Sequence, residues 1–209
     1  MWAAIRPWLF PVWCVGCGVP GIGFCPACAA TAQPAAVVLD GLAVDAASDY
    51  AGAVRDAILA MKRGERAYLD PLAALLAPLV APGSVIVPVT TTRRRAAERG
   101  FDQARELARR VAELRSGTCA DVLLKRGAAQ RGRGRGERLT AQGRFALRPG
   151  APVPPCAVLL DDVLTTGATV RDAAAALGAA GCRIAGAVVV ARTPPGRETR
   201  RGGRRLVGA

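Results

Sequence analysis

Residues 158–170 read VLLDDVLTTGATV, an apolar run that ends in two adjacent carboxylates, Asp161 and Asp162. A loop of Thr, Gly and Ala follows Leu164, and a helix-like segment begins after that loop. In α/β proteins, ligands bind in the crevice at the carboxyl ends of parallel strands. The stretch therefore predicts a strand, a ligand-binding loop and a helix in succession, with the two carboxylates at the end of the strand.

The loop after the carboxylates has the chemistry of a phosphate site. Its backbone N–H groups, its threonine hydroxyls and the N-terminus of the following helix can hold an anion together. Its glycine allows the backbone to approach a ligand closely. The candidate phosphate-binding residues are Thr165, Thr166, Gly167, Ala168 and Thr169. The carboxylates then need ligand hydroxyls or a bound metal, and a ribose 5-phosphate meets both requirements. The alternative interpretation is an ordinary capped helix after a strand.

Strand-like and helix-like segments alternate on both sides of this stretch. Residues 84–89 form a short β-branched run, and residues 101–115 form an amphipathic helix that Asp102 can cap. Further strands are expected in residues 120–126 and 184–192. Such alternation favours an α/β fold with a mainly parallel sheet flanked by helices.

The N-terminal region carries two C-x2-C pairs separated by seven residues, in the run CVGCGVPGIGFCPAC. Two close pairs of thiolates suit tetrahedral zinc, and four sulfur ligands leave no open position for catalysis. We therefore expect one structural zinc on Cys14, Cys17, Cys25 and Cys28. Two disulfides in a secreted protein, or a redox pair, are the alternatives. The other cysteines, Cys119, Cys156 and Cys182, lie in apolar surroundings and are expected in the core.

Composition narrows the choice of partners. The formal net charge is +13, which favours an anionic partner such as phosphate, nucleic acid or an acidic lipid surface, although a genome-wide preference for Arg gives the same excess. The chain contains no histidine, which excludes histidine bases and histidine metal ligands. No apolar run reaches the ~18 to 20 residues of a membrane span, so we expect a cytoplasmic protein.

One segment between strands is rich in Gly and Arg, and we interpret it in three ways. Residues 126–145 read RGAAQRGRGRGERLTAQGRF, which cannot build a core. They can form a solvated loop, an RNA-contacting segment or a lid over a ligand. The basic residues after position 192 are expected to form a frayed tail.

Four segments of the chain resemble those of a known protein family. VLLDDVLTTGATV resembles the phosphoribosyl-pyrophosphate motif of type I phosphoribosyltransferases. Over most of residues 14–192 the chain resembles the ComF family of competence-associated proteins, which combine that fold with an N-terminal zinc ribbon. Three further segments carry the resemblance: the cysteine pairs, VPVTTTRRRAAERGFDQARELA with Asp102 at a usual Asn position, and LLKRGAAQRGRGRGERLTAQGRFAL. The last of these matches the family's flexible loop at Arg126, Gln130, Glu137, Arg138 and Phe145.

The resemblance implies a domain organisation and a set of residue roles. Residues 1–33 would hold the zinc ribbon, residues 34–192 the phosphoribosyltransferase-like domain and residues 193–209 a basic tail. Asp161 and Asp162 would contact the ribose hydroxyls directly or through Mg²⁺, and residues 165–169 would bind the 5-phosphate. Residues 89–95, with Arg99, would approach the pyrophosphate, and residues 126–140 would close over it as a lid. The site residues implied in these segments are Thr90, Thr91, Arg93, Arg95, Arg99, Gln130 and Arg138. The catalytic set implied is Asp161, Asp162, Arg99 and Arg138.

Two classes of function follow, and the sequence leaves both open. The first is a phosphoribosyltransferase that acts on an unidentified acceptor, with phosphoribosyl pyrophosphate or ribose 5-phosphate as its ligand. The second is a non-catalytic nucleic-acid-handling or regulatory module that keeps the fold. The resemblance implies a link to competence, DNA uptake or DNA metabolism, with single-stranded DNA or DNA-uptake proteins as further partners. A homo-oligomer is compatible with either class.

Overall fold

The computed structural model describes residues 12–126 and 143–194. The expected lid at 126–140, with Gln130 and Arg138, lies outside these residues except for Arg126, and so does most of the tail at 193–209.

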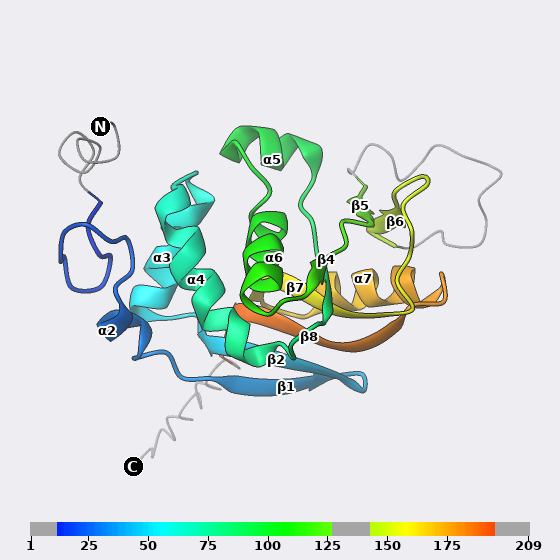
Figure 1. The fold of residues 1–209 in the computed structure, drawn as a ribbon, viewed down its shortest axis with the longest axis horizontal. Helices are drawn as coiled ribbons and strands as arrows, with labels where there is room; N and C mark the ends of the chain where they lie inside the picture. The colour runs from blue at the N-terminus through cyan, green and yellow to red at the C-terminus, as the bar shows by residue number, and fades with distance from the viewer. Residues whose placement is uncertain (1–11, 127–142, 195–209) are drawn as a thin grey trace, which may run out of the picture.

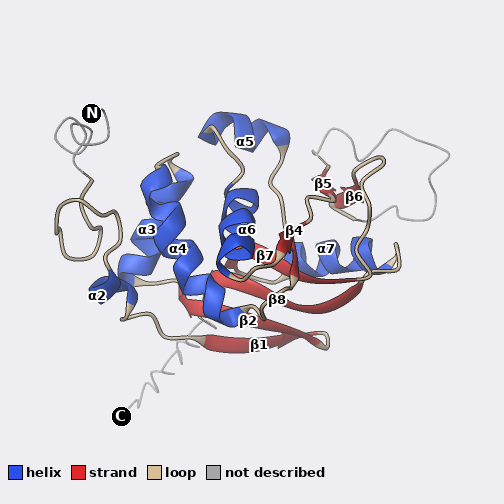
Figure 2. Cartoon of the chain, in the orientation of Figure 1, coloured by secondary structure: helices blue, strands red, loops and turns tan. Residues whose placement is uncertain are grey.

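A six-stranded sheet forms the centre of the molecule, in the order β1-β2-β8-β7-β3-β4 (Figures 1 and 2). The strands are β1 (Ala35–Leu39), β2 (Leu42–Asp49), β3 (Val85–Pro88), β4 (Thr118–Cys119), β7 (Cys156–Leu164) and β8 (Arg183–Arg192). Only the β1–β2 hairpin is antiparallel. The prediction of a mainly parallel sheet flanked by helices is therefore confirmed. A separate antiparallel pair consists of β5 (Leu123–Lys125) and β6 (Phe145–Leu147).

Helices cover both faces of this sheet, and each face has its own core. The helices are α2 (Pro26–Ala29), α3 (Gly52–Lys62), α4 (Leu69–Leu76), α5 (Arg93–Arg99), α6 (Gln103–Leu114) and α7 (Ala168–Gly178), with short 3-10 turns η1 (Arg66–Tyr68) and η2 (Ala77–Leu79). Side chains of α3, α4 and α6 share one core with Leu160, whereas α7 shares the other with Leu159. Successive residues of a strand point to opposite faces, so β7 is buried on both sides. In Figure 1, α5 projects beyond the end of α6.

The strand β7 is longer than the sequence predicts. The apolar pattern places its end before the carboxylates, but β8 pairs with β7 as far as Leu164. On the other side, β3 ends at Pro88, opposite Leu160. Asp161 and Asp162 therefore lie inside β7, next to an edge that β3 leaves unpaired.

The cysteine-rich segment packs against the main core. Cys14, Phe24 and Cys25 are buried in the same cluster as α3 and α4. A Cβ atom at Gly23 would lie 3.0 Å from the ring of Tyr68, so the absence of a side chain allows this close packing. Of the cysteines expected in the core, Cys182 is buried, and Cys119 and Cys156 are half-buried.

Within the described ranges, no helix combines the length and the apolar character that crossing a bilayer requires.

Candidate functional site

A polar cavity of about 150 Å³ lies where β7 runs past the end of β3. It forms because β3 turns away after Pro88 towards α5, while β7 continues. Many residues singled out in the sequence line this cavity, although they come from four separate segments. They are Thr90, Thr91, Arg95, Arg99, Asp161, Asp162 and Thr169. The cavity therefore joins the carboxylate pair to the loop after β3.

The two carboxylates point to opposite faces of β7. Asp162 reaches the α3 side, where the Nζ atom of Lys62 lies 2.9 Å from its Oδ2 atom. The Oδ1 atom of Asp161 accepts a hydrogen bond from the N–H of Asp162 at 2.8 Å. Desolvation, followed by the charge of Asp162, raises the pKa of Asp161 well above its usual value, and the cation of Lys125 opposes this shift. Asp162 is therefore ion-paired with Lys62, whereas ionisation of Asp161 is energetically unfavourable.

The loop after β7 presents a helix N-terminus without a side-chain cap. Gly167 is the N-cap of α7 and has φ = 75°, in the left-handed region that favours glycine. A Cβ atom there would collide with the side chain of Leu39. The N-cap glycine has no side chain that could accept from the first N–H groups of this eleven-residue helix. Among these groups, the N–H of Ala168 donates to the Oγ1 atom of Thr166 at 3.4 Å.

Not every expected phosphate-loop residue lines the cavity. Thr169 does, while Thr165 and Thr166 are exposed to solvent beside it and Arg93 lies exposed on α5. A ligand that spans both places would have its phosphate at the α7 N-terminus and its remaining groups in the cavity.

Sequence reasoning gave no place in the ligand site to four residues of this lining: Lys62, Lys125, Asp102 and Gln103. Asp102 was expected only as a helix cap, which the structure confirms. The segments of these four residues meet only in the folded chain, so no local pattern reveals them. One signal was available, because Lys62 and Lys125 are the only lysines in a chain whose other basic residues are all Arg. The cavity lining thus carries four cations and three carboxylates: Lys62, Lys125, Arg95, Arg99, Asp102, Asp161 and Asp162. With the carboxylates ionised, this excess of positive charge favours an anionic ligand.

Asp102 connects the helix α6 to the loop after β3. Its Oδ1 atom accepts the N–H of Arg105 at 3.2 Å, and its Oδ2 atom accepts the N–H of Thr91 at 3.0 Å. Burial raises the pKa of Asp102, and these two N–H donors oppose the shift. Asp102 therefore caps α6 and fixes the backbone at Thr91.

We expect Asp102→Ala to lower the free energy of unfolding by about 1–2 kcal/mol, since a helix cap and a loop anchor are lost together. Asp102→Asn should cost much less, because the amide oxygen still accepts one N–H and the buried charge is removed. Urea denaturation of the three proteins measures both effects. Equal losses in the two variants would contradict the capping role.

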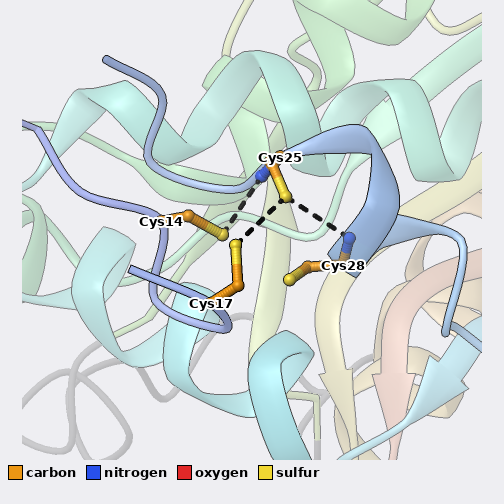
Figure 3. A group of neighbouring side chains, drawn as sticks. All are labelled: Cys14, Cys17, Cys25 and Cys28. Carbon is orange, nitrogen blue, oxygen red and sulfur yellow. Dashed lines mark hydrogen bonds between the residues drawn. The ribbon is translucent and has the colours of Figure 1, made fainter. Parts of the chain in front are cut away.

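The four cysteines of the N-terminal region form a compact sulfur cluster (Figure 3). Their Sγ atoms all lie within 4.8 Å of one another, and those of Cys17 and Cys25 are 3.6 Å apart. Zinc–sulfur bonds of ~2.3 Å in a tetrahedron require sulfurs about 3.8 Å apart, so the cluster fits a zinc ion. Gly16 is required in the first turn, because a Cβ atom there would lie 2.6 Å from Sγ of Cys28.

The protonation of the cluster also suits a metal. Burial opposes ionisation of Cys14, but backbone N–H groups, first that of Cys25, lower its pKa to about 6. The pKa of Cys28 is raised to about 12, first by its hydrogen bond with Cys25 and then by burial. The metal-free cluster therefore contains one readily ionised thiol beside one that strongly retains its proton. A cation that replaces the shared protons would bind all four sulfurs.

No protein-family model matches this chain, and no curated protein is significantly similar to it. The function is therefore inferred from the polar cavity and the cysteine cluster.

Proposed function

We propose that this protein is a phosphoribosyltransferase-like member of the ComF family that binds phosphoribosyl pyrophosphate with Mg²⁺ in the polar cavity. The observation that carries the proposal is the cavity itself. It joins Asp161 and Asp162 to Arg95 and Arg99 and reaches Thr169 in the first turn of α7, whose N-cap is a glycine.

Each part of this ligand has matching groups. The ribose hydroxyls would donate to Asp161 and Asp162, and the 5-phosphate would accept from the N–H groups at the start of α7. Arg95 and Arg99 would neutralise the pyrophosphate. Breaking the bond between ribose and pyrophosphate requires positioning and charge neutralisation, not a protein nucleophile, so a site without histidine suffices.

A magnesium ion is compatible with the residues present. Mg²⁺ prefers carboxylate oxygens, water and phosphate oxygens, and Asp161 and Asp162 supply the carboxylates. Desolvation disfavours the ionised form of Asp161, and a cation beside it would offset this cost. When bound, Mg²⁺ would neutralise charge that develops on the leaving pyrophosphate. The cysteine cluster would hold a separate structural zinc.

Titration calorimetry with Mg²⁺ tests this proposal. Phosphoribosyl pyrophosphate should bind one site per chain, and ribose 5-phosphate should bind the same site more weakly because it lacks the pyrophosphate. If neither compound binds, the proposal is ruled out. Pyrophosphate release during a screen of purine, pyrimidine and nicotinate acceptors would then identify an enzyme, linked through the family to DNA uptake or DNA metabolism.

One surface feature supports a second candidate, a nucleic-acid-handling module without catalysis. Arg93, Arg94 and Arg95 begin α5 and are all exposed beside the cavity. Binding of a single-stranded oligonucleotide that weakens steeply with salt would favour this function. Competition between the oligonucleotide and phosphoribosyl pyrophosphate would show whether one surface serves both.

A further inference from the structure

The side-chain amide of Gln103 is an unexplained group in the wall of the polar cavity. Gln103 is the first residue of α6, lines the cavity and is only 2% exposed. Its Nε2 atom has no hydrogen-bond partner among the described residues. Buried donors in folded proteins are normally paired, so an unpaired one in a cavity wall points to a missing acceptor.

A neighbouring arginine fixes which way the amide faces. The Nη1 atom of Arg99 donates to the Oε1 atom of Gln103 at 3.0 Å. A guanidinium carries only donors, so the amide oxygen must face Arg99 and the NH₂ group must face away. The orientation of the amide therefore follows from its partner.

The carboxylate that precedes Gln103 in the chain already accepts two backbone N–H groups. Asp102 uses one oxygen for the N–H of Arg105 and the other for the N–H of Thr91. The amide hydrogens of Gln103 thus have no protein acceptor within the described residues, while Arg95 and Arg99 share the same cavity. Near Gln103 the cavity therefore combines an unpaired amide donor with two guanidinium groups, which suits a group rich in acceptor oxygens.

We propose that Gln103 is a ligand-positioning residue whose amide donates to an oxygen of the pyrophosphate group. This inference rests on the proposed function. The ribose hydroxyls are themselves donors and match Asp161 and Asp162, and the 5-phosphate matches the N-terminus of α7. The pyrophosphate is the remaining part of the ligand, and its oxygens are acceptors that Gln103 and Arg99 can bind together.

Titration of three compounds into wild type and Gln103→Leu tests the assignment. The compounds are phosphoribosyl pyrophosphate, inorganic pyrophosphate and ribose 5-phosphate, each with Mg²⁺. The variant should lose about tenfold or more in affinity for the two compounds that carry pyrophosphate, as the loss of a hydrogen bond to a charged group does. Its affinity for ribose 5-phosphate should stay within about twofold. An equal loss for all three compounds, or no loss for pyrophosphate, would overturn the inference.

Two controls separate ligand positioning from structural support. Gln103→Leu removes an unsatisfied donor, so its melting temperature should stay within about 2–4 °C of the wild-type value or rise. Gln103→Glu keeps an acceptor for Arg99 but loses the donors, and should bind pyrophosphate at least as weakly as the Leu variant. Wild-type affinity in Gln103→Glu would also overturn the inference.

The same titrations distinguish failure of the proposed function from failure of the role assigned to Gln103. Wild-type binding of phosphoribosyl pyrophosphate with no effect of Gln103→Leu would remove only the role of Gln103. Binding of inorganic pyrophosphate without phosphoribosyl pyrophosphate would remove the proposed function, and the pyrophosphate data would still decide the role of Gln103. No binding of any compound would remove both.

Discussion

Protein with Cys25→Ser is expected to lose its zinc and to unfold at a much lower temperature than wild type. Cys25 is 7% exposed and lies in the same core as α3 and α4, so loss of the metal would disturb more than the cysteine-rich segment. Structural zinc contributes on the order of 10 kcal/mol in small zinc-binding domains. We expect a loss of several kcal/mol here, because part of this core packs without the metal.

Elemental analysis and thermal unfolding measure the two parts of this prediction. Wild type purified without added metal should contain about one zinc per chain, and Cys25→Ser close to none. Cys156→Ser is the matched control, because Cys156 lies at the start of β7, outside the cluster. It should keep its zinc. A full equivalent of zinc in Cys25→Ser, or unchanged melting after treatment with a chelator, would contradict the structural role.

The pKa values of the cluster add a pH dependence to this prediction. Cys28, with its pKa raised to about 12, is protonated at neutral pH in the metal-free protein and must lose that proton when zinc binds. Zinc affinity should therefore fall as the pH is lowered. Cys14, with its pKa lowered to about 6, should contribute little to this fall above neutral pH.

The sequence predicts the local parts of these sites well. The cysteine spacing brings four sulfurs together because each C-x2-C turn is a local structure, and the sulfurs do cluster within 4.8 Å. The T-T-G-x-T loop likewise predicts the turn before α7, because Gly167 has a backbone conformation that favours glycine. The alternation of strand-like with helix-like segments also predicts the mainly parallel sheet.

Contacts between distant segments were not predictable in this way. The pairing of Lys62 with Asp162 joins residues 100 positions apart and depends on how α3 packs on the sheet. The length of β7 depends on pairing with β8, which continues past the apolar run. Gln103 belongs to a segment that carries the family resemblance, but that resemblance gave it no role; the contact with Arg99 and the missing acceptor point to one.

Replacing either carboxylate of the pair Asp161 and Asp162 should cause a large loss of ligand affinity. Asp161→Asn and Asp162→Asn should each weaken binding of phosphoribosyl pyrophosphate by about 1–3 kcal/mol, as lost charge-assisted hydrogen bonds do. This range corresponds to a loss of affinity of about fivefold to more than a hundredfold. Thr165→Val is a control at the same end of β7, because Thr165 is exposed outside the cavity lining. If the helix N-terminus holds the phosphate mainly through backbone N–H groups, this variant should lose less. Equal affinity of wild type and the double Asp variant would remove the site.

The Asp161→Asn and Asp162→Asn variants should differ in their stability against unfolding. The direction of each change follows from the surroundings of the carboxylate that is replaced. The pKa of Asp161 is raised by desolvation and by Asp162, so its stabilising contribution is present at acid pH and is lost as the pH rises through the raised pKa. At neutral pH this raised pKa opposes folding, because burial disfavours the ionised carboxylate. Asp161→Asn should therefore stabilise the free protein by about 1 kcal/mol while it weakens ligand binding. Asp162→Asn breaks the ion pair with Lys62 and should not stabilise it. Thermal unfolding from about pH 4 to pH 8 should show the advantage of Asp161→Asn growing with pH. If the stability of Asp161→Asn relative to wild type stays constant or shrinks as the pH rises, ionisation of Asp161 does not oppose folding. Ligand binding would then not have to overcome the desolvation of Asp161.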